Sequence, residues 1–188
     1  MENKQVGALA SALELVRSLH HRPSIVAVDG RSSSGKTTLA ARIAAAVPDS
    51  CVVHTDDIAW HQAVLDWDGL LAAGVLRPFR SGREISYRPP QWEPHGRSGS
   101  IDVPASCALL LVEGVGSGRR ELSGLLDAVI WVETDDAVLR RRDAARVAAG
   151  EISPADHAAW MAEEHPFVAE QRTWERADLV VRGDTDLP

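Results

Sequence analysis

The sequence predicts an α/β fold in which a parallel β-sheet is covered by helices on both faces. Short aliphatic and β-branched runs alternate along the chain with segments whose apolar residues recur at helical spacing. Strands that alternate with helices build a parallel sheet in three layers. The length of 188 residues, with 45% hydrophobic and 25% charged residues, predicts one globular domain over 1–188.

Strands and helices are expected to follow one another in a regular order. Five apolar runs are expected to form the sheet: Ile25–Asp29, Cys51–His54, Ala108–Val112, Ala128–Val132 and Leu179–Arg182. Helices are expected at the N-terminus, where Val6, Leu9, Leu13 and Val16 recur at helical spacing, and over Lys36–Val47, Arg119–Leu126 and Asp136–Ala149. Pro48 and Gly150 mark the ends of two of these helices.

The interval 57–107 is too long for a simple connection, because loops in compact domains run about 4–6 residues. Within it, Asp66–Leu76 has a helical pattern that Pro78 is expected to close. Glu84–Arg88 and Ser100–Val103 are expected to pair as short strands. We predict that 57–107 is an insertion that builds a pocket.

Composition argues against several classes of protein. The chain has no apolar run of about 18 residues, so no transmembrane helix is expected. Glu14 interrupts the apolar start of the chain and favours an amphipathic helix over a signal peptide. The net charge of -7 argues against a nucleic-acid or membrane partner. We therefore predict a small-molecule partner, and a homo-oligomer stays open. Cys51 and Cys107 lack zinc-site spacing and are expected to be buried reduced thiols, so we predict a cytoplasmic protein.

The most informative segment follows the first predicted strand and reads Gly30-Arg31-Ser32-Ser33-Ser34-Gly35-Lys36-Thr37, continued by Thr38. Two glycines, a lysine and a hydroxyl residue at this spacing, between a strand and a helix, are typical of a phosphate-binding P-loop. Backbone N–H groups of such a loop bind phosphates. Lys36, one of two lysines, adds charge for the β- and γ-phosphates, and Thr37 can ligate Mg²⁺. A serine- and glycine-rich surface turn is the plainer alternative.

The rest of the sequence narrows the class of nucleotide-binding protein. A GTPase would need an Asn/Thr-Lys-x-Asp motif, for which neither lysine is available. A transport ATPase would need a Leu-Ser-Gly-Gly-Gln signature, which Leu122-Ser123-Gly124 begins and Leu125 breaks. A motor ATPase is disfavoured by the short length of the chain. A small kinase or a nucleotide-dependent switch remains.

Acidic residues follow two of the predicted strands, at the edge where open α/β sheets bind their ligands. Asp56 and Asp57 come after the second strand, and Glu113 follows the third. One carboxylate there can accept the proton of an attacking hydroxyl, and another can hold Mg²⁺, for which we predict Thr37 and Glu113 as ligands. A helix N-cap is the alternative for Asp56 and Asp57.

An arginine run, Leu139-Arg140-Arg141-Arg142, follows the fourth predicted strand, and Arg146 lies one turn later. Arg142 and Arg146 would share a helix face. We predict that they belong to a lid over about 136–176 and that Arg142 or Arg146 neutralises phosphate charge in the transition state. The second long segment, Glu151–Arg176, is predicted to be helical and part of this lid. A solvated helix face is the alternative.

The insertion carries side chains suited to a polar or anionic small molecule. The predicted acceptor site combines ring faces with hydrogen-bonding groups, and its members are Asp57, Tyr87, Arg88, Trp92, His95, Arg97 and Glu113. Tryptophans are more often core anchors, which is the alternative for Trp92 and the assignment for Trp131. The histidines without a partner pattern, predicted at the surface, are His20, His21, His157 and His165.

The chain resembles the uridine kinase-like branch of P-loop kinases, which includes uridine–cytidine kinases, phosphoribulokinase and bacterial pantothenate kinase. The resemblance spans about 24–183. It rests on the P-loop Gly30–Thr38, His54-Thr55-Asp56-Asp57, Val112-Glu113-Gly114, the arginine run after Trp131-Val132-Glu133-Thr134, and Arg176-Ala177-Asp178. It implies a five-stranded parallel sheet in the order 2-3-1-4-5, ATP and Mg²⁺, a hydroxyl acceptor and Asp56 as catalytic aspartate. The sequence departs from the family at Ile58-Ala59, where members have Phe-Tyr.

The residues and the resemblance together lead to one hypothesis, an ATP-dependent kinase that phosphorylates a hydroxyl of a small metabolite. Its predicted catalytic residues are Lys36, Asp56, Arg142 and Arg146. One alternative is a nucleotide-binding regulatory protein that hydrolyses ATP slowly. Another is a nucleotide monophosphate kinase, which the arginines of the insertion suggest.

Overall fold

A computed structural model describes residues 7–20 and 23–183 of the chain. Five strands form one parallel sheet: β1 (Ser24–Gly30), β2 (Ser50–His54), β5 (Leu109–Glu113), β6 (Ala128–Glu133) and β7 (Leu179–Arg182). Their spatial order is β2-β5-β1-β6-β7, and every neighbouring pair is parallel. This order is the predicted 2-3-1-4-5, so the α/β class and the sheet topology are confirmed.

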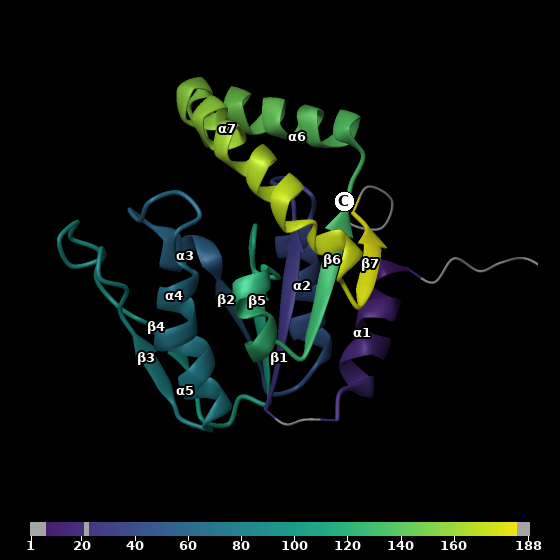
Figure 1. Ribbon diagram of the computed structural model, residues 1–188, viewed down its shortest axis with the longest axis vertical. Coiled ribbons are helices and arrows are strands. Elements are labelled where there is room, and N and C mark those ends of the chain that lie inside the picture. Colours follow the sequence, from purple (N-terminus) through teal and green to yellow (C-terminus); the bar gives the residue numbers. More distant parts are fainter. Residues whose placement is uncertain (1–6, 21–22, 184–188) are drawn as a thin grey trace, which may run out of the picture.

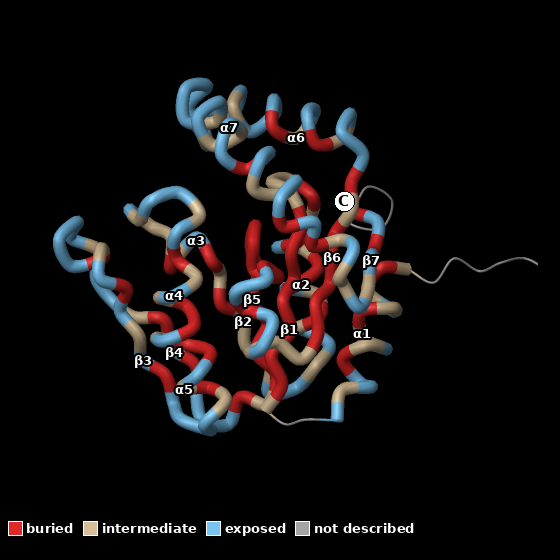
Figure 2. Tube along the Cα trace, viewed as in Figure 1, coloured by how far each residue is buried: buried red, intermediate tan, exposed pale blue. Residues whose placement is uncertain are grey.

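Helices cover both faces of the sheet and create a separate hydrophobic core on each (Figures 1 and 2). Side chains alternate along β1, with Ile25 on one face and Val26 on the other. The Val26 face packs against α1 (Ala8–Ser18) and α2 (Lys36–Ala46). The buried residues of α1 are Ala8, Ala12 and Val16, whereas Leu9 and Leu13 flank that contact and the predicted Val6 lies outside the described residues.

The opposite core is covered mainly by the insertion. It contains α3 (Thr55–Ala59), α4 (Asp68–Leu71), a π-helical turn (Ala72–Leu76) and α5 (Arg77–Arg80). The strands β3 (Ile85–Tyr87) and β4 (Ile101–Val103) pair antiparallel, as predicted. The remaining connection on this face, Arg120–Leu125, is a 3-10 helix shorter than the expected Arg119–Leu126.

Pro78 does not end the helical segment that begins at Asp68, so that expectation was wrong. A proline ring clashes with the carbonyl four residues earlier in a regular α-helix. Here the π-helical turn Ala72–Leu76 precedes Pro78 and changes the hydrogen-bond spacing, and such a turn accommodates the ring.

Two long helices, α6 (Asp136–Ala148) and α7 (Pro154–Gln171), lie over the carboxyl ends of the strands (Figure 1). Ser153 caps α7 by accepting the Asp156 backbone N–H at 3.0 Å. A 3-10 turn, Thr173–Glu175, leads from α7 to β7. We call α6 and α7 together the lid. No helix in the described ranges is long and apolar enough to cross a membrane.

Candidate active site

The loop between β1 and α2 has the backbone form that the glycine spacing predicts. Gly35 adopts the left-handed conformation at the start of α2, with φ 99°. A Cβ at Gly30 would lie 2.6 Å from the Val132 carbonyl oxygen, so only glycine fits there without a shift. The first N–H groups of α2 have no acceptor within the helix. They therefore form a ready site for an anion at the tip of β1.

Carbonyl groups of this loop are held from outside. Arg142 donates from Nη1 to the Ser33 carbonyl at 3.0 Å, and the Thr134 hydroxyl donates to the Ser34 carbonyl at 2.9 Å. The Lys36 side chain is buried, and its Nζ donates to the Arg31 carbonyl at 2.8 Å. The loop is therefore held in place by Arg142 of the lid, by Thr134 just before the lid, and by its own Lys36.

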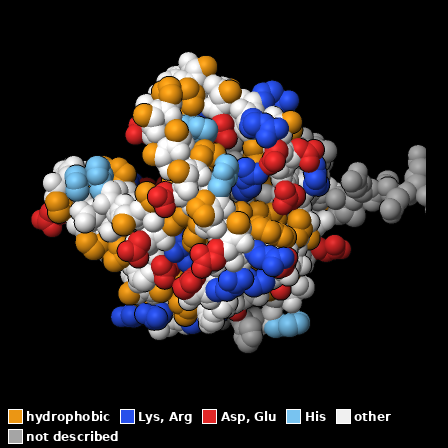
Figure 3. Space-filling model, turned by 45° about the horizontal axis from the view of Figure 1, so that its top comes forward, with side chains coloured by type: hydrophobic (Ala, Val, Ile, Leu, Met, Phe, Trp, Pro, Cys, Tyr) orange, Lys and Arg blue, Asp and Glu red, His pale blue; other side chains and the backbone are white. Residues whose placement is uncertain are grey.

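A cavity of about 520 Å³ opens above the loop. Three groups of residues line it. They come from the loop and α2 (Ser32, Ser33, Gly35, Lys36, Thr37, Thr38), from the segments that follow β2 and end β5 (Asp56, Glu113, Gly114, Val115), and from the lid and the connection between its two helices (Arg142, Asp143, Arg146, Ile152, His157, Trp160). The space-filling view shows the insertion and the lid as two lobes with a notch between them (Figure 3). The cavity thus combines predicted residues from three distant parts of the sequence.

Thr37 and Glu113, the predicted metal pair, are in direct contact. The Thr37 hydroxyl donates to Glu113 Oε1 at 3.1 Å. The other oxygen, Oε2, lies 2.7 Å from His54 Nδ1, which orients the carboxylate. A hydroxyl and a carboxylate are hard oxygen ligands of the kind that Mg²⁺ prefers. The chemistry of this pair therefore fits Mg²⁺.

Asp56 faces the same cavity from the first turn of α3. Gly114 allows this turn to lie close to the end of β5, because a Cβ at Gly114 would lie 1.7 Å from the Thr55 hydroxyl oxygen. Desolvation raises the pKa of Asp56, the negative charge of Glu113 raises it further, and Lys36 lowers it. A carboxylate with a raised pKa is a better proton acceptor, which suits a general base.

The lid contributes both predicted arginines to the cavity. Arg142 also donates from Nη2 to the Gly183 carbonyl at 3.0 Å. Arg146 pairs with Glu151 at 3.3 Å, and both side chains are largely exposed. Arg142 therefore has a structural role in holding the loop, whereas Arg146 is better placed to change partners.

The sequence interpretation missed three lid residues that line the cavity. His157, predicted at the surface, is half-buried, with Nε2 3.6 Å from Asp143 Oδ2. Asp143 accepts the Ser33 hydroxyl at 2.5 Å. Trp160 donates from Nε1 to the Ser32 hydroxyl oxygen at 2.7 Å. On α7, residues 157, 160 and 164 recur at helical spacing and so share one face of the helix. This spacing was the signal available in the sequence for His157 and Trp160.

Most of the predicted acceptor residues form a cluster in the insertion, outside the set that lines the cavity in the described structure. Arg97 pairs with Asp57 and lies with its guanidinium 3.8 Å over the Trp92 ring. Trp92 is buried and donates to the Asp57 carbonyl at 2.9 Å. The cluster therefore fixes the position of Asp57, the residue that follows Asp56.

The other members of this acceptor group are engaged with the protein. Tyr87 packs against the helical segment, so that a Cβ at Gly74 would lie 2.5 Å from its ring. Arg88 donates to the Arg97 carbonyl at 3.0 Å. The His95 ring stacks on His61 with 3.8 Å between ring centres. Their role in binding an acceptor stays a prediction.

Comparisons with known proteins bear on the fold. No family model and no curated protein matches this chain. Among solved structures it is similar to a possible uridine kinase from Bacillus stearothermophilus, with a TM-score of 0.55 and 20% identity over 92% of this chain and 96% of that one. It is also similar to a putative fructose transport system kinase from Silicibacter sp. TM1040, with a TM-score of 0.63 and 20% identity over 92% and 98% of the two chains.

The chain has the fold of a P-loop kinase. The predicted resemblance to the uridine kinase-like branch is thereby confirmed at the level of the fold. In this P-loop kinase fold, the loop 30–38 occupies the tip of the central strand β1. Glu113 ends the neighbouring strand β5, and Asp56 lies in α3, just after β2, the next strand on that side.

Proposed function

We propose that this protein is an ATP-dependent kinase that transfers the γ-phosphate of ATP to a hydroxyl group of a small metabolite. The observation that carries the proposal is the joint placement of Lys36, Asp56 and Glu113 in one cavity beneath the lid. A phosphoryl-transfer site needs a cradle for the triphosphate, a metal site and a base for the acceptor. In this proposal Lys36 belongs to the cradle, Glu113 belongs to the metal site, and Asp56 is the base.

The triphosphate lies along residues 30–38 in this proposal. Backbone N–H groups at the start of α2 bind its phosphate oxygens, and Lys36 turns from the Arg31 carbonyl toward the β- and γ-phosphates. Arg31 contributes through its backbone, because its side chain leaves the cavity and pairs with Asp136. Thr37 and Glu113 would hold Mg²⁺. When bound, Mg²⁺ supplies neutralisation of phosphate charge.

Asp56 accepts the proton of the acceptor hydroxyl. The hydroxyl oxygen then forms a bond to the γ-phosphorus while the bond from that phosphorus to the β–γ bridging oxygen breaks. The products are a phosphate ester and ADP, and the proton stays on Asp56 until solvent removes it. Arg146 neutralises charge on the equatorial oxygens of the transferred group.

Two contacts favour an alcohol over a phosphate-bearing acceptor. The Arg97 guanidinium is paired with Asp57, and the Arg88 guanidinium donates to a backbone carbonyl. The two arginines of the predicted acceptor site, Arg88 and Arg97, are therefore already engaged. The acceptor enters between insertion and lid, where Asp57, Tyr87, Trp92 and His95 shape the insertion side.

The test is a screen for acceptor-dependent ADP release. Wild-type protein is incubated with ATP, Mg²⁺ and nucleosides, sugars, pantothenate-like alcohols or amino-alcohols, with Lys36→Ala as the matched control. The proposal expects one acceptor class to raise ADP release many-fold in the wild type only. Phosphorus NMR of the product should show an ester and not an anhydride. Slow ADP release that no acceptor changes would favour a nucleotide-dependent regulatory protein instead.

A further inference from the structure

The peptide that joins Arg31 to Ser32 is held from both sides. Its N–H, on Ser32, donates to Glu164 Oε1 at 2.7 Å. Its C=O, on Arg31, accepts from Lys36 Nζ at 2.8 Å. The C=O and N–H of a trans peptide point in opposite directions. A lid carboxylate on one side and the loop ammonium on the other therefore act on the same rigid plane.

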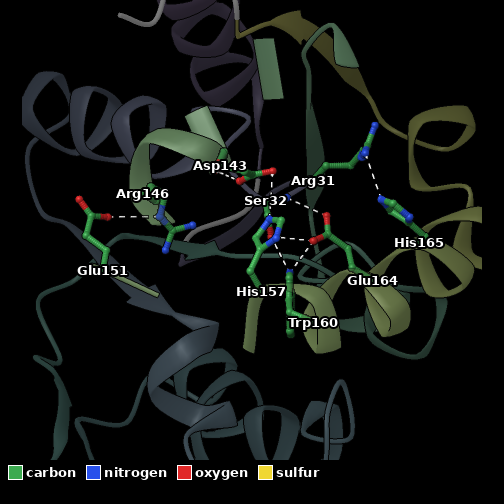
Figure 4. Close-up of polar contacts among 10 residues, drawn as sticks. Arg31, Ser32, Asp143, Arg146, Glu151, His157, Trp160, Glu164 and His165 are labelled. Atoms are coloured by element: carbon green, nitrogen blue, oxygen red, sulfur yellow. Dashed lines mark hydrogen bonds and ion pairs between the residues drawn. The ribbon is translucent and has the colours of Figure 1, made fainter. Parts of the chain in front are cut away.

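Glu164 is fixed firmly enough to orient this peptide. Its side chain is 0% exposed, and its second oxygen accepts the Ser32 hydroxyl at 2.6 Å and the Trp160 indole N–H at 2.5 Å. Figure 4 shows the Glu164 and Trp160 side chains of α7 converging on Ser32. A buried carboxylate is costly unless donors satisfy it, so three short hydrogen bonds leave it little freedom.

The other loop carbonyls have different supports. Arg142 holds the Ser33 carbonyl, and Thr134 holds the Ser34 carbonyl. Besides the contact from Lys36, the Arg31 carbonyl accepts one longer hydrogen bond among residues 7–20 and 23–183, from the Ser34 N–H at 3.2 Å. Glu164 is thus the lid group that orients the one loop carbonyl in contact with the lysine.

We propose that Glu164 is a positioning residue that acts on Lys36 through the Arg31–Ser32 peptide. By keeping the Arg31 carbonyl turned toward Lys36, it sets the resting place of the ammonium beside the phosphate cradle. The inference deepens the proposed function and rests on it, because it assumes that Lys36 contacts the phosphates of ATP. It assigns α7 a role in nucleotide binding that does not require Glu164 to touch the nucleotide.

The test is a double-mutant cycle on ATP affinity, measured by calorimetry with ATP and Mg²⁺ and without acceptor. Glu164→Ala is expected to raise the Kd of the otherwise wild-type protein about tenfold. In the Lys36→Ala background, the same substitution is expected to leave the Kd unchanged, because the group it positions is gone. An equal rise in both backgrounds would mean that Glu164 supports the structure generally, and would overturn the inference.

Three further variants make the double-mutant cycle more specific. Glu163 is the exposed neighbour on α7, so Glu163→Ala is the matched control and should bind ATP as the wild type does. Glu164→Gln keeps an oxygen for the Ser32 N–H and should lie between the wild type and Glu164→Ala. If Glu164→Ala does not fold, as judged by circular dichroism, Glu164→Leu replaces it and preserves more of the buried volume. A wild type that binds no ATP would overturn the proposed function together with this inference, whereas additive effects would overturn the inference alone.

Discussion

The carboxylate of Asp29 accepts the backbone N–H of Gly116 at 2.8 Å, and this contact joins the end of β1 to the loop that follows β5. The same carboxylate accepts the N–H groups of Gly30 at 2.7 Å and Gly118 at 3.1 Å. It is 1% exposed. Asp29 therefore sets the spacing between the phosphate loop and the strand end that carries Glu113.

Asp29→Ala should be strongly destabilising, because it leaves three buried N–H groups without their acceptor. A loss of about 3 kcal/mol in the free energy of unfolding is expected. Asp29→Asn keeps the shape and one acceptor oxygen and should lose less. Urea denaturation of both variants checks this, and an Asp29→Ala protein as stable as the wild type would show that the three contacts are dispensable.

His54 should make stability depend on pH. Its hydrogen bond to Glu113 is the largest influence that raises the pKa of His54 above its ordinary value of 6.5. Because the folded-state pKa is the higher one, the stabilisation is complete below the ordinary value and is lost as the pH rises through the folded pKa. The difference in free energy of unfolding between wild type and His54→Ala should therefore be larger at about pH 6 than at about pH 9.

Urea melts of both proteins across this pH range measure that difference. His20 lies far along the chain from the site, and His20→Ala serves as a control that should show no such trend. A constant difference between wild type and His54→Ala at all pH values would exclude the charged pair as its source.

Arg146→Ala should slow catalysis without unfolding the protein. The side chain lines the cavity, and its ion pair is with an exposed partner, Glu151. Surface pairs contribute little to stability. A decrease in kcat of about 10²-fold, with little change in Tm, is expected if Arg146 neutralises transition-state charge. Arg141→Ala, on an exposed neighbouring position of α6, is the matched control and should keep full activity.

The parts of the fold that depend on local pattern were predictable. The apolar runs identified all five strands of the sheet, and the spacing from Gly30 to Thr37 located the loop at the end of β1. Glu113 and Asp56 could be placed near that loop because strand ends in a parallel sheet share one edge. The helical segment continues through Pro78, although a proline usually ends a helix. The π-helical turn that precedes Pro78 depends on tertiary packing, so the sequence did not predict it.

The sequence predicted the lid arginines of α6 but not the site residues of α7. Arginine spacing located Arg142 and Arg146, but His157, Trp160 and Glu164 resemble ordinary residues of a solvated helix until α7 is placed over the loop. Glu164 in particular is a charged residue that becomes fully buried, and its hydrogen bonds to Ser32 and Trp160 stabilise it there. The spacing of these three residues places them on one helix face, but it does not show which part of the protein that face contacts.

Asp56→Asn should separate nucleotide binding from chemistry. The substitution removes the proton acceptor but leaves Lys36 and the loop in place. ATP affinity should stay close to that of the wild type while kcat falls by about 10²–10⁴-fold. Calorimetry and the ADP-release assay give the two values separately, and an Asp56→Asn protein with normal kcat would remove Asp56 from the role of base.

The most direct measurement is a crystal structure with Mg²⁺ and a non-hydrolysable ATP analogue. We expect the phosphates to lie on the N–H groups of 33–38, with the γ-phosphate between Lys36 and Asp56. A nucleotide bound elsewhere on the protein, or a γ-phosphate turned away from the Asp56 carboxylate, would contradict it.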